Sequence, residues 1–162
     1  MRSAQGVFHK IFTIEKLMQQ VTVWRMQDKK IAFTNGVFDI IHQGHIASLA
    51  EAASFADVLI VGVNADISVK KLKGPTRPIN DQGARALLLA SLLQTDAVII
   101  FEEDTPLELI KKLLPDVLIK GGDYTLDQIV GAAEVIAAGG EVKIAQILPG
   151  ISSTGIIAAL DK

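Results

Sequence analysis

The sequence predicts an α/β protein, with a doubly wound sheet of about five parallel strands in a single domain over residues 1–162. Short apolar runs alternate with helix-like stretches, which is the order of elements in such a sheet. The chain has 162 residues, 49% of them apolar, which is enough for one domain with a sizeable core. No internal repeat or linker divides it, so we expect the core to occupy about residues 30–160.

Apolar runs predict the strands. Most of the runs are rich in Val and Ile and are bounded by polar residues or Gly. Such runs are typical of strands buried on both faces, as in a parallel sheet. The predicted strands cover residues 31–34, 58–63, 97–101, 117–120 and 142–147.

The stretches between these runs predict helices. A leading helix is expected at about 14–27, and others at 46–55, 81–93, 105–114 and 153–160. In the helix at 105–114, Thr105 is the expected N-cap and Pro106 the first helical residue. Pro115 then ends that helix.

Composition limits the possible functions. The absence of cysteine excludes disulfides, thiolate metal sites and cysteine nucleophiles. With a net charge of −2, the chain has neither the basic excess nor the polybasic run that favours a nucleic-acid or membrane partner. Its start does not resemble a signal peptide, and no apolar run approaches the ~18 residues of a spanning helix. We therefore expect a soluble, cytoplasmic protein.

Two of the three histidines follow the first predicted strand, in TNGVFDIIHQGH (34–45). His42 and His45 are three residues apart at a predicted helix start, so both can face one side. Gly36 lets the backbone pass close to a ligand, and Gly44 leaves room for a phosphate. The helix N-terminus adds backbone donors. This pattern predicts an anion site, and the alternative is a surface pair that caps the helix.

Three further loops follow predicted strands, where doubly wound sheets bind ligands. Residues 63–80 are expected to form a basic loop that closes over phosphates. The alternative is a charged loop that is simply solvated. Residues 120–124 place two glycines and an aspartate where a ribose could bind, although the same residues suit a plain turn. Residues 149–157 place three hydroxyl residues at a helix start, which suits a triphosphate tail or simple capping.

Other chemistries lack their motifs. The sequence contains no phosphate-loop motif, no G-x-G-x-x-G after the first strand and no G-x-S-x-G elbow. Three histidines without matching carboxylate spacing make a zinc site improbable. Asp39, Asp66 and Asp123 are scattered, so a Mg²⁺ ion would be held mainly by substrate phosphates rather than by protein ligands alone.

The chain resembles the H-x-G-H nucleotidyltransferase superfamily in two places: His42-Gln43-Gly44-His45 after a strand, and Ile151-Ser152-Ser153-Thr154 before the last helix. More specifically, FTNGVFDIIHQGH, LKGPTRPIN, FEEDTPLELI, LPDVLIKGGDY and GISSTGII resemble the D-glycero-β-D-manno-heptose 1-phosphate adenylyltransferases. Those enzymes occur as separate chains and as the second half of bifunctional ADP-heptose synthases. The resemblance covers about residues 11–160.

The resemblance implies a Rossmann-like fold and an adenylyl transfer from ATP, with Mg²⁺, to a sugar 1-phosphate. His42 and His45 would bind the ATP phosphates and stabilise charge in the transition state. Lys73 would reach the reacting phosphates. Asp39, Asn64 and Arg77 would bind the acceptor substrate, with Asp39 facing either the sugar phosphate or the metal. The nucleotide would be bound by Thr34, Asn35, Gly36, Phe38, His42, Gly44, His45, Gly121, Gly122, Asp123, Ser152, Ser153 and Thr154.

One position departs from the family pattern. Family members often carry Glu-Gln-Arg or Glu-Asp-Arg after the basic loop, whereas this chain has Gly83-Ala84-Arg85. Two other functions therefore stay open: a cytidylyltransferase for glycerol 3-phosphate or a similar alcohol phosphate, and a non-catalytic nucleotide-binding module. The resemblance also implies a homodimer and a separate sugar kinase upstream.

Overall fold

A six-stranded parallel sheet in the order β1-β4-β3-β2-β5-β6 forms the centre of the protein. The computed structural model describes residues 6–122, 124–145 and 153–160. Five strands confirm the predicted runs, although residues 146–147 of the last run lie outside the described residues. β1 was not predicted, because two residues are too few to show a period. The strands are β1 (Ile11–Phe12), β2 (Ile31–Gly36), β3 (Val58–Asn64), β4 (Ala97–Phe101), β5 (Val117–Gly121) and β6 (Glu141–Ala145).

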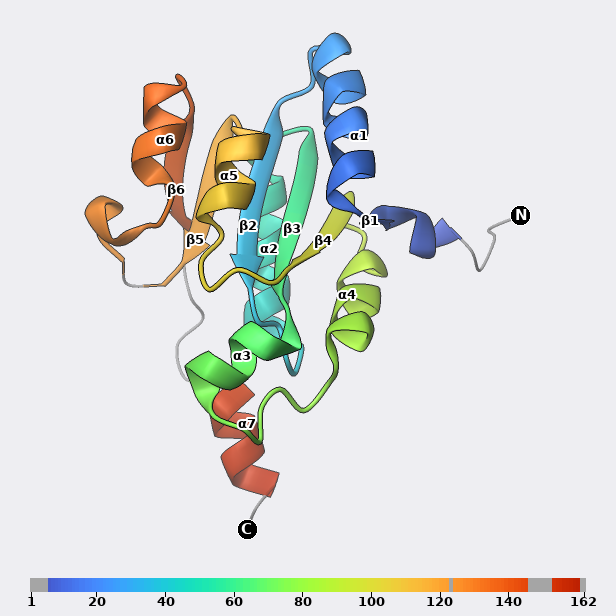
Figure 1. The fold of residues 1–162 in the computed structure, drawn as a ribbon, viewed down its shortest axis with the longest axis vertical. Coiled ribbons are helices and arrows are strands. Elements are labelled where there is room, and N and C mark those ends of the chain that lie inside the picture. The colour runs from blue at the N-terminus through green and yellow to red at the C-terminus, as the bar shows by residue number, and fades with distance from the viewer. Residues whose placement is uncertain (1–5, 123, 146–152, 161–162) are drawn as a thin grey trace.

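Helices cover both faces of the sheet, with α1 and α5 in front and α2 behind in Figure 1. On one face, Leu17, Ile110 and Val135 bring α1, α5 and α6 into one apolar cluster. On the other, Leu49 and Leu89 bring in α2 and α4. The helices are α1 (Ile14–Met26), α2 (Gln43–Ala53), α3 (Asp66–Lys73), α4 (Gln82–Ala90), α5 (Leu107–Leu113), α6 (Ala132–Ala137) and α7 (Ser153–Leu160), with short 3₁₀ turns η2 (Phe8–Lys10) and η3 (Leu126–Gln128).

The prediction of a basic loop over residues 63–80 is wrong for its first half, because residues 66–73 form α3. Val69 is buried there, so the segment has an apolar side that supports a helix. The residues that break helices, Gly74, Pro75 and Pro78, all follow α3. The lysines fall in its last turn, where positive charge is favourable to the helix dipole.

Two helix starts differ from the sequence-based expectation: α2 begins at Gln43 rather than at residue 46, and α5 begins at Leu107 rather than at Pro106. In α5, Pro106 occupies the N-cap position, and Thr105 does not cap the helix. The Gly83-Ala84 departure does not prevent α4 from forming, because the Asp81 carboxylate accepts the Ala84 N–H at 2.8 Å and caps it.

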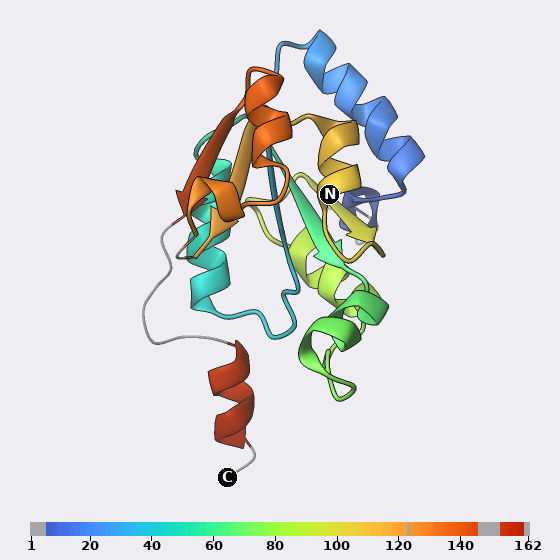
Figure 2. The ribbon, with the colours of Figure 1, turned by 60° about the vertical axis from the view of Figure 1, so that its left-hand side comes forward.

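The sheet order places a crevice between β2 and β5. From β2 the chain builds outward through β3 and β4, and it then returns to place β5 and β6 on the other side of β2. Ligands bind in doubly wound sheets where the order reverses in this way, beyond the carboxyl ends of the strands. Helices α3 and α7 lie beyond those ends (Figures 1 and 2).

Candidate active site

A cavity of about 370 Å³ opens at the carboxyl ends of β2 and β5. It unites side chains from the end of β2, the first turns of α2 and α7, the last turn of α3 and the end of β5. Most of the predicted nucleotide-binding residues in the described ranges therefore meet in one place. Its lining comprises Thr34, Asn35, Gly36, Val37, Phe38, His42, Gly44, His45, Ser48, Leu49, Lys73, Lys120, Gly121, Tyr124 and Ser153.

The chain turns sharply where β2 ends. Phe38 has a positive φ of 51°, which is uncommon for a residue with a side chain. Its ring folds back over the strand end, so that a Cβ on Gly36 would lie 3.0 Å from Phe38 Cε2. Glycine at position 36 therefore allows the turn. The turn places the ring 5.3 Å from the ring of His45, centroid to centroid.

The two histidines stack against each other at the start of α2. Their ring centroids are 3.9 Å apart, and the ring planes are inclined by 22°. His42 is the N-cap residue but makes no side-chain cap bond, and Gly44 is buried between the two. Both Nδ1 atoms are buried, and no described residue hydrogen-bonds to either of them. A buried polar atom without a partner is unfavourable, so this pair is suited to a ligand that supplies one.

Burial lowers the pKa of both imidazoles. For His45 the burial is reinforced by the positive charges of His42 and Lys73; together they outweigh the opposite effect of the Ile40 backbone and bring the pKa to about 4. Burial also lowers the pKa of His42, and it lowers that of Lys73, with a further contribution from Arg77. The site therefore gathers cationic groups that an anionic ligand would stabilise in their charged forms.

The first residue of α7 joins the site. The Ser153 hydroxyl donates to the backbone carbonyl of Ile40 at 3.2 Å, which links the helix start to the loop before α2. Gly121 lines the cavity, whereas Gly122 does not. Asp123 and Ser152 lie outside the described residues, as does the side chain of Thr154.

Asp39 and Arg77 do not line the cavity, because they bind each other beside it. Arg77 Nη2 lies 2.6 Å from Asp39 Oδ2, and the Asp39 carboxylate also accepts the N–H groups of Ile79 and Asn80, each at 2.9 Å. Burial alone would raise the pKa of Asp39, but these backbone bonds and Arg77 hold it below its usual range. Asn64, at the end of β3, is buried and also outside the lining.

Arg85 links the segment around Asn80 to neighbouring elements by hydrogen bonds. This arginine is fully buried. Its guanidinium donates to the carbonyls of Asn80 at 3.0 Å and Val37 at 2.7 Å, and to Asp66 Oδ1 at 2.6 Å. One side chain thus joins α4 to the turn that carries Phe38 and to the start of α3.

Five lining residues are not among the predicted site residues: Val37, Ser48, Leu49, Lys120 and Tyr124. Lys120 directly follows the three buried residues of β5, and its ammonium lies 5.8 Å from the ring centroid of Tyr124. Burial lowers the pKa of this lysine. The signal that could have found it is a charged residue directly after buried strand residues, at the carboxyl end of a central strand.

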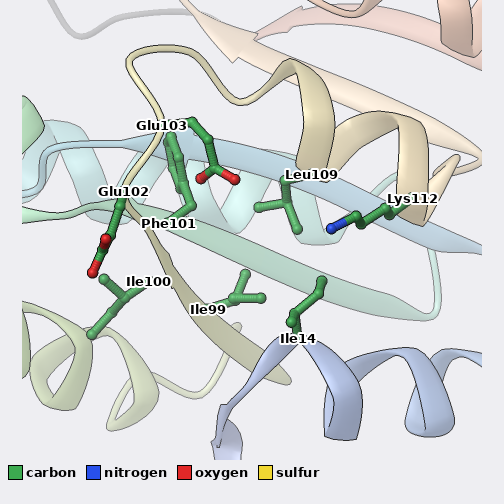
Figure 3. Close-up of a pocket in the computed structure, with 8 residues that line it drawn as sticks. All are labelled: Ile14, Ile99, Ile100, Phe101, Glu102, Glu103, Leu109 and Lys112. Atoms are coloured by element: carbon green, nitrogen blue, oxygen red, sulfur yellow. The ribbon is translucent and has the colours of Figure 1, made fainter.

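A larger cavity, of about 590 Å³, lies elsewhere, between the start of α1, the end of β4 and α5. Figure 3 shows apolar side chains and two carboxylates around it. It has no histidine, and its two carboxylates outnumber its single lysine, so its charge is unfavourable for a phosphate despite its size. Its lining comprises Ile14, Ile99, Ile100, Phe101, Glu102, Glu103, Leu109 and Lys112.

Comparison with known proteins places these features in a family. A family model described as Cytidylyltransferase-like matches residues 33–159. The chain belongs to this cytidylyltransferase-like family. Bifunctional protein HldE of Acidiphilium cryptum (strain JF-5) is 48% identical over 159 residues, which is 98% of this chain and 33% of that protein. HldE of Rhodopseudomonas palustris (strain BisB18) is 55% identical over 135 residues, 83% of this chain and 28% of that protein. The chain thus spans about a third of the length of these curated relatives.

Solved structures support the same fold. The lipopolysaccharide core biosynthesis protein from Thermoplasma volcanium GSS1 is 30% identical with a TM-score of 0.59, over 74% of this chain and 97% of that one. Pantoate-beta-alanine ligase from Francisella tularensis, complexed with beta-gamma ATP and beta-alanine, has a TM-score of 0.60 at 17% identity, over 93% of this chain and 76% of that one. The second likeness shows the fold alone.

In this cytidylyltransferase-like domain the described lining of the cavity contains no carboxylate. Among the described residues, no group of three or more His, Asp or Glu side chains is placed to hold a metal ion. Within the described part of the chain, the cavity lining therefore offers no carboxylate ligand to a Mg²⁺ ion. No helix within the described ranges is long and apolar enough to span a membrane.

Proposed function

We propose that this chain transfers the adenylyl group of ATP to a heptose 1-phosphate, giving an ADP-sugar and pyrophosphate. The observation that carries the proposal is the stacked pair His42 and His45, whose buried Nδ1 atoms lack partners at the start of α2 inside the cavity. Two nitrogen donors, a helix N-terminus and Lys73 together suit the phosphates of a nucleotide.

The reaction is a direct displacement. An oxygen of the sugar 1-phosphate attacks the α-phosphorus of ATP, the bond to the β-phosphate oxygen breaks, and pyrophosphate leaves with that electron pair. Because the nucleophile is already an anion, no general base is needed. The role of His42, His45 and Lys73 is to position the phosphates and to stabilise the charge that develops on them. Mg²⁺, carried by ATP, would neutralise part of the phosphate charge.

ATP is the proposed nucleotide, and CTP is the alternative that the family description raises. The relatives near 50% identity favour ATP, because their name, Bifunctional protein HldE, agrees with the ADP-heptose synthases that the sequence motifs resemble. A cytidylyltransferase for glycerol 3-phosphate shares the H-x-G-H pair and the hydroxyls before the last helix.

The proposal also includes an upstream kinase, a cellular location and an oligomeric state. The reaction needs a sugar kinase to supply the 1-phosphate, and we expect a cytoplasmic enzyme, since its substrates are charged metabolites. We also expect a homodimer. Size-exclusion chromatography with light scattering tests the last point.

A pyrophosphate-release assay tests the function. The purified chain is given ATP or CTP with Mg²⁺, and as acceptors both anomers of heptose 1-phosphate together with glycerol 3-phosphate. Release with ATP and a heptose 1-phosphate supports the proposal. Release only with CTP and glycerol 3-phosphate would establish the alternative enzyme, and ATP binding without any release would indicate a non-catalytic module.

A further inference from the structure

A second, smaller cavity of about 180 Å³ adjoins the candidate active site, and we call it the side chamber. Asn35, Lys120 and Tyr124 line both cavities. The side chamber lies on the other face of the sheet from α2, because its residues Leu118 and Ile129 belong to the apolar cluster that joins α1, α5 and α6. The two cavities therefore meet at the carboxyl ends of β2 and β5, one on each side.

We propose that Lys120 binds the phosphate of the sugar 1-phosphate and that the side chamber holds the sugar ring. This assignment rests on the proposed function. It gives each substrate its own part of the site: ATP lies against the histidines, and the acceptor approaches from the opposite face of the sheet.

Lys120 is suited to an incoming anion. No carboxylate of the described residues pairs with it, and the group that faces its ammonium is the ring of Tyr124 at 5.8 Å. Burial disfavours its charged form. A half-buried ammonium without a carboxylate is costly unless a ligand supplies the negative charge. In-line attack needs the acceptor phosphate on the side away from the leaving pyrophosphate, and Lys120 stands where the two cavities join.

The walls of the side chamber suit one sugar ring. Tyr124, Pro106 and Val130 offer apolar surface to the C–H faces of a sugar. Asn35 and Gln128 offer side-chain amides to its hydroxyls. The Gln128 carbonyl oxygen already accepts the Thr125 N–H at 3.0 Å, which leaves its NH₂ group to donate. A volume of 180 Å³ is below the ~300–1,000 Å³ of pockets that enclose a whole ligand, so the chamber fits part of one.

Two substitutions test the assignment. Lys120→Gln removes the charge, and Val130→Phe fills the chamber from a position that is 41% exposed, where folding is little affected. The matched control is Ile136→Phe, on a surface position of α6 that lines neither cavity. The measurements are the KM for heptose 1-phosphate in the pyrophosphate assay and the Kd of ATP alone, by calorimetry.

We expect both substitutions to raise the KM for heptose 1-phosphate, Lys120→Gln by roughly 10- to 100-fold, the loss of a charged hydrogen bond. The Kd of ATP should stay within about twofold, and the control should change neither value. Unchanged KM values in an active enzyme would overturn the assignment and leave the proposed function intact. A weaker Kd of ATP in Val130→Phe with an unchanged KM would place the nucleobase in the chamber and also overturn it. No pyrophosphate release by the wild-type chain with any sugar 1-phosphate would contradict the proposed function, and this assignment with it.

Discussion

Two polar regions lie on either side of Phe38 and differ in how their groups are satisfied. On one side, Asp39 accepts two backbone N–H groups besides its ion pair with Arg77, and Arg85 donates to three acceptors. On the other side, His42 and His45 stack together with buried nitrogens that no described residue satisfies. The first region has the character of a structural support, and the second that of a binding site.

The residues that hold the elements around the cavity in place are therefore different from the residues that would contact the substrate. The saturated region holds the turn at Phe38, α3 and the segment around Asn80 in one arrangement, and Lys73 extends into the cavity from the end of α3. Charged residues near an active site are therefore not all ligands. Substitutions in the two regions should have opposite profiles, one in stability and the other in turnover.

The largest effect is expected at the histidines. His42→Ala or His45→Ala removes one donor to the reacting phosphates, and kcat should fall by roughly 10²- to 10³-fold, by analogy with oxyanion donors. The free energy of unfolding should change by less than about 1 kcal/mol, because neither ring makes a protein hydrogen bond at Nδ1. His9→Ala, in η2 and outside the cavity, is the control. Near-wild-type kcat in both site variants would remove the catalytic assignment.

The next effect is expected at Arg85. Arg85→Met should lower the free energy of unfolding by roughly 3 kcal/mol, because it leaves two backbone carbonyls and Asp66 without their donor. Urea denaturation measures this. The matched control is Lys71→Met, which removes an exposed pair with Asp104 and should cost less than about 1 kcal/mol. Equal losses in the two variants would show that Arg85 is not a structural support.

A smaller effect is expected at Asp39. In Asp39→Asn the amide oxygen can still accept from Ile79 and Asn80, but the ion pair with Arg77 is lost. We expect the free energy of unfolding to fall by about 1–2 kcal/mol in urea denaturation. A loss of kcat at unchanged stability would instead mean that this carboxylate acts on the substrate.

The smallest expected effect is on the pH dependence of stability, to which His45 and Asp39 contribute in different pH ranges. The pKa of His45 falls from 6.5 to about 4 on folding, so between these values the unfolded chain holds more protons and acid favours unfolding. Stability should decline from pH 6.5 towards pH 4 by on the order of 1 kcal/mol, after allowance for solvent screening. The contribution of Asp39, whose pKa is depressed, is lost only at lower pH, below its ordinary value of 3.8. Thermal melts of wild type and His45→Gln check this, and identical pH slopes above pH 4 would contradict it.

The sequence predicted the parts of the molecule that depend on local pattern. Buried runs such as residues 58–63 identify central strands, and the histidine pair after a strand does lie in the cavity at the carboxyl end of that strand. The partner of Asp39 could not be predicted, since Arg77 is 38 residues away and no local pattern shows that two charges close on each other. Lys120 was missed although it directly follows buried strand residues, because its place in the cavity depends on the pairing of β5 with β2.

The most direct test of the central claim, that the histidine pair receives nucleotide phosphates, is an NMR titration of the three imidazoles with and without ATP. The low pKa of His45, about 4, predicts a neutral ring in the free protein at pH 6. Bound phosphates should raise the pKa of His45 and His42 and shift their signals, while the signal of His9 stays in place. Signals of His42 and His45 that do not respond to saturating ATP would contradict the account.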